Sequence, residues 1–241
     1  MRLCLGSGGL STDARRRAWI DTLDAFLGPV RTVLYVPHAL EDHDAYLEWM
    51  ARLGFAAGRT LVGLHTQADP VATVNSADAV YVGGGNTFRL LADLERLGVL
   101  DALRRRVLAG MPYVGISAGT VLACPTIRTT NDMPIEWPRS PEALRLVPFQ
   151  VNPHYVSGAF YQREVDWYLR YGGETRDDRL REFHERNAVP ILALREGAIL
   201  LVEGPRATVV GAAGARLFRR GLPTDDIPAG ADVSALFAPA S

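Results

Sequence analysis

A serine on a sharp strand-to-helix turn is the strongest chemical signal in the sequence. Gly115-Ile116-Ser117-Ala118-Gly119 ends the apolar run MPYVGI and precedes the helix-compatible run TVLAC. This pattern is typical of a nucleophile elbow, in which small neighbours let the serine adopt a strained, exposed position. The amide of Ala118 could then stabilise an oxyanion at a helix N-terminus. The alternative is a glycine-rich turn in which Ser117 only caps a helix.

A second glycine-rich turn, Gly83-Gly84-Gly85-Asn86, follows the apolar run DAVYV. Glycines allow close backbone approach to a substrate and leave amides as donors. The turn lacks both GxGxxG spacing and a P-loop lysine, which disfavours a nucleotide site. We expect it to supply an oxyanion amide beside Ser117, the alternative being a turn that only needs positive φ.

A serine nucleophile needs a base, and there are five candidates: His38, His43, His65, His154 and His184. His43 and His184 lie in charged helical stretches and are expected to face solvent. His38 and His65 end predicted strands, so either could line a cleft. His154 is favoured because it ends an apolar strand and follows an Asn-Pro pair, whose proline stiffens the backbone.

The acid that orients such a base has two candidates. Glu196 lies just past the apolar run PILAL, and Asp132 lies in TTNDMP, between the serine and the favoured histidine. Spacing does not choose between them.

An arginine pair in GETRDDR could bind a carboxylate. Arg176 and Arg179 lie one turn apart on a predicted helix that Thr175 could cap. Two guanidinium groups form a fork suited to a carboxylate. A solvated helix with internal ion pairs is the alternative.

Short apolar runs alternate with amphipathic stretches and must position these residues. We predict strands at 2–5, 32–37, 61–65, 79–82, 113–116, 149–151, 191–194, 199–202 and 208–211. Helices are predicted from a cap at Ser11 to residue 26, then at 42–53, 87–97 and 100–108, with a further helical region reaching residue 186. This order predicts an α/β fold, a three-layer αβα sandwich with a mostly parallel sheet and an antiparallel pair near its end. Ligands bind such sheets beyond the carboxyl ends of the strands.

Composition limits the classes of function. The formal net charge is -1, without the basic excess expected of a nucleic-acid partner or a membrane surface. All 26 basic residues are arginine, which excludes Schiff-base, Ser–Lys and P-loop chemistry that needs lysine. Two cysteines without CxxC spacing, and no signal-peptide core or long apolar run, predict a cytoplasmic protein.

Several segments together resemble the dipeptidase E family of serine peptidases, the α-aspartyl dipeptidases. They are VGGGNTFRLL, GISAGT, LACPTIRTTNDMPI, NPHY, GETRDDR and LREG. The resemblance runs from the first strand to about Gly211, and LACPTIRTTNDMPI is its most specific part. It implies a class I glutamine amidotransferase-like fold and hydrolysis of peptides that begin with aspartate without a metal or cofactor. The chain length fits one domain, so we expect a single peptidase domain over residues 1–241.

The resemblance also implies the catalytic roles. Ser117 matches the nucleophile, His154 the base and Glu196 the third member of the triad. Asp132 matches a supporting acid, and the two oxyanion amides match Gly85 and Ala118.

For substrate binding the resemblance assigns the aspartate side chain to Arg176, and we expect Asn86 to contribute as well. The expected partner is a small peptide, and the protein is expected to be a monomer or homodimer. The segment 155–172 is longer than in bacterial dipeptidase E and could form a lid, with Tyr161, Trp167, Tyr168 and Tyr171 as its aromatic residues.

Three rival functions are possible. An α/β-hydrolase esterase shares the elbow but places its histidine after its acid, whereas Glu196 follows every histidine here. A glutaminase on the same fold would need cysteine at position 117. A non-catalytic protein that binds small peptides or amino acids is the remaining alternative.

Overall fold

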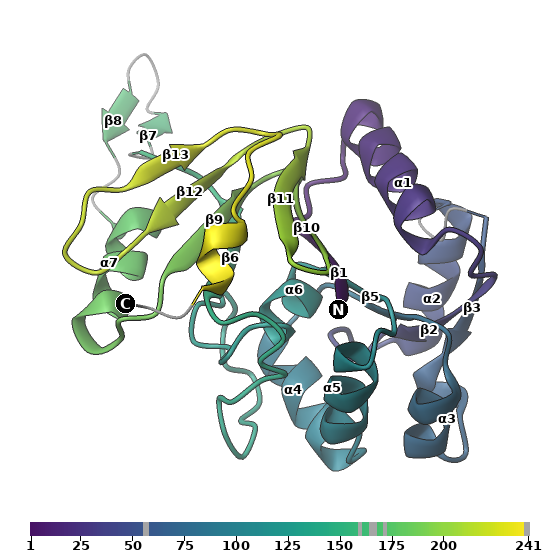
Figure 1. Ribbon diagram of the computed structural model, residues 1–241. Coiled ribbons are helices and arrows are strands. Elements are labelled where there is room, and N and C mark those ends of the chain that lie inside the picture. The colour runs from purple at the N-terminus through teal and green to yellow at the C-terminus, as the bar shows by residue number, and fades with distance from the viewer. Residues whose placement is uncertain (55–57, 159–160, 164–167, 171–172, 239–241) are drawn as a thin grey trace.

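The computed structural model of the chain describes residues 1–54, 58–158, 161–163, 168–170 and 173–238. In this part of the chain a seven-stranded sheet forms the middle layer (Figure 1). Five neighbouring strands are parallel, and β10 and β11 extend the sheet antiparallel beside β1. In spatial order the strands are β11 (Arg206–Gly211), β10 (Ala198–Glu203), β1 (Arg2–Gly6), β5 (Tyr113–Ile116), β4 (Val80–Val82), β2 (Thr32–Val36) and β3 (Thr60–Gly63).

Helices cover both faces of this sheet because its central strands carry apolar residues on both sides. In β1, Leu3 and Leu5 pack on one face and Cys4 on the other. The Cys4 face packs against α1 (Asp13–Leu27) and α2 (His43–Arg52). The other face packs against α3 (Pro70–Ser76), α4 (Thr87–Arg96), α5 (Leu100–Leu108) and α6 (Ala118–Leu122). This arrangement confirms the predicted three-layer αβα sandwich.

A second sheet lies toward the β10–β11 side of the large one (Figure 1). Its strands are β13 (Asp225–Ile227), β12 (Ala215–Phe218), β9 (Ile191–Arg195) and β6 (Gln150–Tyr155), of which β6 and β9 are parallel. The helix α7 (Arg176–Arg186) packs on this sheet through Leu180. The remaining elements are the hairpin β7 (Tyr161–Arg163) and β8 (Tyr168–Arg170), and the 3-10 turns η1 (Leu64–Thr66) and η2 (Ser234–Phe237).

Several predicted elements were wrong, mostly where a short segment depends on distant pairing. The helical region expected before residue 176 contains the end of β6 and the β7–β8 hairpin instead. The strands β12 and β13 and the helix α3 were not predicted. Helix α1 is capped by Thr12, whose side chain accepts from the Arg15 amide, rather than by Ser11. The strand expected at 61–65 ends at Gly63, because the chain turns there into η1.

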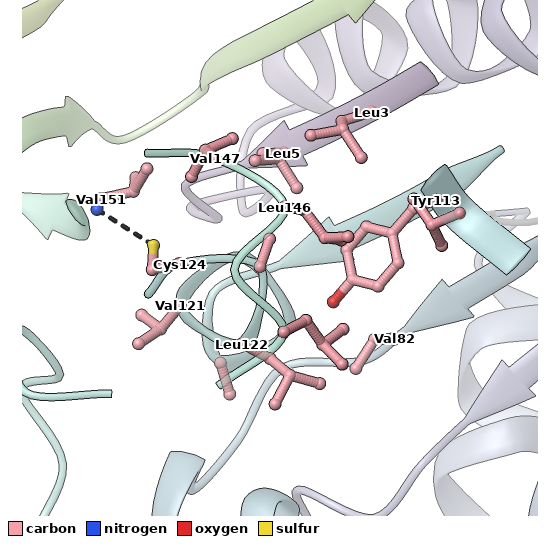
Figure 2. Packing of buried hydrophobic residues seen from close by; sticks show 14 of the residues in the cluster. Leu3, Leu5, Val82, Tyr113, Val121, Leu122, Cys124, Leu146, Val147 and Val151 are labelled. Atoms are coloured by element: carbon pink, nitrogen blue, oxygen red, sulfur yellow. Dashed lines mark hydrogen bonds between the residues drawn. The ribbon is translucent and has the colours of Figure 1, made fainter. Parts of the chain in front are cut away.

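The core behind the elbow packs β1, β4 and β5 against α6 and the segment that follows it. Figure 2 shows Leu122, Leu146 and Val82 around the ring of Tyr113. The Tyr113 hydroxyl is fully buried and donates to the Gly119 carbonyl over 2.6 Å. Both cysteines are buried thiols, and burial raises the pKa of Cys4 and of Cys124 to about 12. They therefore pack as small apolar side chains.

None of the helices in the described ranges combines the length and the apolar character needed to cross a bilayer.

Candidate active site

Ser117 lies between β5 and α6 in the conformation that the elbow pattern predicts. Its backbone has φ 53° and ψ −109°, a region that L side chains rarely adopt. The turn is tight because its glycines have no room for a side chain. A Cβ on Gly115 would lie 2.5 Å from the Gly119 carbonyl oxygen, and one on Gly119 would lie 2.3 Å from that of Val82. The surrounding backbone therefore holds the strained serine in place.

His154 is brought to Ser117 by β6 of the second sheet. Its Nε2 atom lies 2.8 Å from the Ser117 Oγ atom, and its own φ is 57°. The fully buried hydroxyl of Ser7 holds this backbone: it donates to the Leu194 carbonyl and accepts from the His154 amide over 2.8 Å. Ser7 thus connects the end of β1 to the second sheet. The sequence analysis missed it, although its place after a parallel strand was a usable signal.

Glu196 lies in the turn between β9 and β10 and completes a hydrogen-bonded chain. Its Oε1 atom lies 2.8 Å from His154 Nδ1. The pKa of Glu196 is lowered, chiefly by the hydrogen bond with His154, while partial burial opposes that shift. An ionised carboxylate on Nδ1 favours the tautomer in which Nε2 can accept a proton from Ser117.

The four-residue turn after β4 leaves one amide for a ligand. The Gly83 amide donates to Val36, the Gly84 amide to the Tyr46 hydroxyl over 2.8 Å, and the Asn86 amide to Ala39 over 2.8 Å. In the described part of the chain no acceptor faces the Gly85 amide. The φ of Gly85 is 134°, and a Cβ there would lie 2.4 Å from the Ala39 carbonyl oxygen, so the turn requires glycine.

Ala118 supplies the first residue of α6, directly after the nucleophile position. Its amide is one of the first-turn donors that have no partner within a helix. Together the Gly85 and Ala118 amides are donors suited to a developing oxyanion.

Asp132 is held rigidly by α4 and by its own loop. Its Oδ2 atom accepts from the Thr87 amide over 2.8 Å, from the Thr87 hydroxyl over 2.6 Å and from the Thr130 hydroxyl over 2.9 Å. These threonines were not predicted as site residues, and only their places in the VGGGNT and TTNDMP segments could have indicated them. Asp132 is therefore not the partner of His154, a choice that spacing had left open.

A cavity of about 250 Å³ brings Asp132 together with Ser117, His154 and Arg176. Arg176 is the first residue of α7, which Thr175 and Asp178 start with a capping box. Partial burial lowers the pKa of Arg176 below its usual value, with nearby Arg179 acting in the same direction. The guanidinium stays charged and faces a cavity suited to a carboxylate.

Arg179 does not form the expected fork with Arg176. Its Nε atom lies 3.4 Å from Glu174 Oε2, in an ion pair on the exposed side of the helix. Only Arg176 lines the cavity.

Asn86 uses its side chain within the protein. It accepts from the Arg89 amide as the cap of α4, and its Nδ2 atom donates to the Met133 carbonyl over 2.8 Å. It is not among the residues that line the Ser117 cavity. Its contact with substrate stays a prediction.

The other histidines lie elsewhere. The rings of His38, His43 and His65 contact one another, with centroids 4.6 to 6.5 Å apart, and His65 bonds Asp44. His184 was expected to face solvent but is buried, and its Nδ1 atom lies 3.1 Å from the Asn187 carbonyl oxygen. In the described ranges no group of three or more His, Cys, Asp or Glu side chains is placed to hold a metal ion.

The lid predicted for the long segment falls partly outside the described residues. Trp167 and Tyr171 lie outside the described residues, and Tyr161 and Tyr168 are described only as backbone of the β7–β8 hairpin.

Known proteins resemble this chain in sequence and in fold. Residues 3–210 match the model of Peptidase family S51. The chain belongs to this family. Peptidase E of Streptomyces coelicolor is 49% identical over 90% of this chain and 86% of its own length. A Drosophila melanogaster protein named a probable alpha-aspartyl dipeptidase is 44% identical over 86% of this chain and 84% of its own.

Solved structures share the fold. A peptidase from an acI-B1 actinobacterium superposes with a TM-score of 0.64 at 17% identity, over 96% of each chain. A structure from Listeria monocytogenes EGD-e superposes with a TM-score of 0.65 at 23% identity. The match covers 88% of this chain and 98% of that one. The expected family is thus confirmed, and the chain is a serine-type dipeptidase. This membership favours it over the esterase and over the non-catalytic binding protein.

Proposed function

We propose that the chain hydrolyses dipeptides and short peptides that begin with aspartate, through an acyl-enzyme on Ser117. The observation that carries the proposal is the single cavity in which a hydrogen-bonded Ser117–His154 pair meets Arg176 and Asp132. The side with Ser117 and His154 can carry out acyl transfer, and the side with Arg176 and Asp132 can bind a charged amino acid.

In the first step His154 takes the proton of Ser117 as the hydroxyl oxygen attacks the peptide carbonyl carbon. The 2.8 Å separation of Oγ and Nε2 is within hydrogen-bonding range. Glu196 holds the ring through Nδ1 and stabilises the imidazolium that forms. His154 then protonates the leaving amine, and water, activated by the same base, hydrolyses the ester on Ser117.

Negative charge on the carbonyl oxygen needs donors at the moment of attack. The amides of Gly85 and Ala118 are suited to this, because neither has an acceptor in the described part of the chain. Removal of one such donor typically costs about 3 kcal/mol of transition-state stabilisation. The partial positive charge at the start of α6 acts in the same direction.

Recognition of aspartate would use two charges of opposite sign. Arg176 is suited to the side-chain carboxylate, since a half-buried guanidinium loses little binding energy to competing water. Asp132 is suited to the free α-ammonium group. Three donors fix its Oδ2 atom, which leaves Oδ1 to accept from the substrate. A peptide held at both groups has its first carbonyl in register with Ser117.

The test is the turnover of Asp-Leu, Asn-Leu, Glu-Leu and Ala-Leu by wild type, Ser117→Ala and Arg176→Ala. We expect wild type to cut Asp-Leu and Ser117→Ala to show no cleavage of it. Arg176→Ala should lower kcat/KM for Asp-Leu by about 100-fold, as expected for loss of one buried charge partner.

Arg179→Ala is the matched control, one helical turn away and paired with Glu174. It should keep most of the wild-type activity. Equal cleavage of Asn-Leu and Asp-Leu by wild type would refute the role of Arg176.

A cytoplasmic location remains part of the proposal. It is supported by the two cysteines, which are buried thiols in separate strand and loop positions.

A further inference from the structure

A second cavity touches Ser117 and His154 and shares only these two residues with the Arg176 cavity. Its volume is about 250 Å³. The carbonyl carbon under attack must lie at Ser117 Oγ, so the two parts of the peptide on either side of that carbon need separate space. With the aspartyl part beside Arg176, the leaving residue falls into the second cavity.

The walls of this cavity differ in chemistry from those of the first. Large apolar and aromatic side chains line it: Leu10, Tyr46, Trp49, Met50, Tyr81 and Ile116. Apart from His154, no acidic or basic side chain of the described residues contributes to the lining. Such a surface gains free energy by burying apolar groups and loses it by desolvating charged ones.

The aromatic wall is rigidly attached to the turn that carries Gly85. The Tyr46 hydroxyl accepts from the Gly84 amide over 2.8 Å, and the ring packs edge-on against Tyr35 with centroids 5.5 Å apart. Trp49 follows one turn later on α2, its ring centroid 5.9 Å from that of Tyr46. A side chain bound here therefore contacts an element that also positions the oxyanion amide.

An open groove leads outward from the second cavity along α2. It shares Tyr46, Trp49, Gly84 and Gly85 with the cavity, and Asp42 and Arg52 also line it. The groove gives the carboxylate of the leaving residue a solvated path past Arg52. The apolar cavity is then available for the side chain of that residue rather than for its charge.

We propose that this cavity is the leaving-group subsite, the Trp49 subsite, and that it selects a large apolar second residue such as Leu, Met or Phe. The inference rests on the proposed function and extends it to the second residue of the substrate. Trp49 is 41% exposed, so a side chain bound beside it covers a ring that otherwise contacts water.

The test compares kcat/KM for Asp-Leu and Asp-Phe with that for Asp-Ala and Asp-Asp. All four give the same aspartyl ester on Ser117, so differences report on binding and acylation alone. We expect Asp-Leu and Asp-Phe to be favoured by about 10-fold or more, since even one methylene group in an apolar pocket is worth about 10-fold. Trp49→Ala should reduce this preference to within about threefold, because the indole ring supplies much of the apolar surface that a large side chain would contact and an alanine side chain would not.

Leu108→Ala, on an exposed residue at the end of α5, is the control and should keep the full preference. If wild type cuts Asp-Ala and Asp-Asp as fast as Asp-Leu, the proposed apolar subsite is refuted. The proposed specificity for an N-terminal aspartate is not affected by that result. The pair Ala-Leu and Ala-Ala separates the two claims. If Asp-X peptides are not preferred but Ala-Leu is cut faster than Ala-Ala, the aspartate proposal fails and the Trp49 subsite stands.

Discussion

Gly8, two residues after the end of β1, faces the imidazole of His154 and leaves no space for a methyl group. A Cβ at this position would lie 2.5 Å from His154 Cε1 and 3.2 Å from Nε2. Gly8→Ala therefore changes no residue of the Ser117–His154–Glu196 chain but displaces its central member.

The size of the effect follows from contact distances. Carbon atoms in contact lie about 3.5 to 4.0 Å apart, so the ring must move by about 1 Å. The Ser117–His154 separation is 2.8 Å, and a shift of that size takes it beyond hydrogen-bonding range. A misplacement of about 1 Å typically lowers the rate about 100-fold. We expect that loss in kcat/KM, equivalent to about 2.7 kcal/mol.

The assay is steady-state cleavage of Asp-Leu, with thermal unfolding measured on the same samples. Gly110→Ala is the matched control: its φ is 113° against 127° for Gly8, and a Cβ there meets nothing within 4 Å. Both variants should lose similar stability from backbone strain, about 1 to 3 kcal/mol. The reasoning is refuted if Gly8→Ala keeps kcat/KM close to that of Gly110→Ala.

Three further outcomes are expected. Glu196→Gln should lower kcat by about 10²- to 10⁴-fold in steady-state kinetics with KM little changed, because an amide on His154 Nδ1 favours the wrong tautomer; a loss under tenfold contradicts this. Burial, with the neighbouring imidazoles adding to it, lowers the pKa of His38 from 6.5 to about 4. The unfolded chain therefore binds a proton in that range that the folded chain does not, and the free energy of unfolding should fall by about 3 kcal/mol between those pH values. Urea unfolding at pH 7 and pH 4 checks this, and His38→Asn should show a smaller fall than wild type. Tyr113→Phe removes the buried donor to the Gly119 carbonyl and should lower the free energy of unfolding by about 1 to 2 kcal/mol in denaturant titrations; unchanged stability would contradict the hydrogen bond.

Local patterns were enough to predict the central layer of the fold. The alternation of apolar runs and amphipathic stretches predicted β1, β2, β4 and β5, and the helices α1, α2, α4 and α5, to within a few residues. A parallel βα unit is built from neighbouring segments, so its signal lies in one short window of sequence. The second sheet was only partly visible, because β12 and β13 are short strands whose stability depends on pairing with β9.

Two predictions of side-chain position were wrong where the charge pattern of a helix did not indicate which of its faces is buried. His184 lies in a helix of mostly charged residues, which predicted a solvent-facing ring, yet it is 7% exposed. Arg176 and Arg179 have the spacing of a pair, but Arg179 turns to Glu174. Helical spacing specifies which side chains share a face. Which face is covered depends on the sheet that the helix packs against.

The sequence by itself determined the residue types and the strained turn of the site. Ser117 and its glycines specify an elbow because the required close approaches, to Gly119 and Val82, occur within one βα unit and its neighbour. Local patterns left the partners of that serine open, and the family resemblance implied His154 and Glu196. Only the tertiary structure shows the two hydrogen bonds that join them. Glu196 and Asp132 are equivalent in sequence, but the parallel pairing of β6 with β9 places the carboxylate that follows β9 on His154. Asp132 is instead held by the threonines of α4 and its own loop. The Ser117–His154 and His154–Glu196 hydrogen bonds join residues that lie 37 and 42 positions apart in the sequence. Such bonds depend on strand order and register, and no local window of the sequence contains that information.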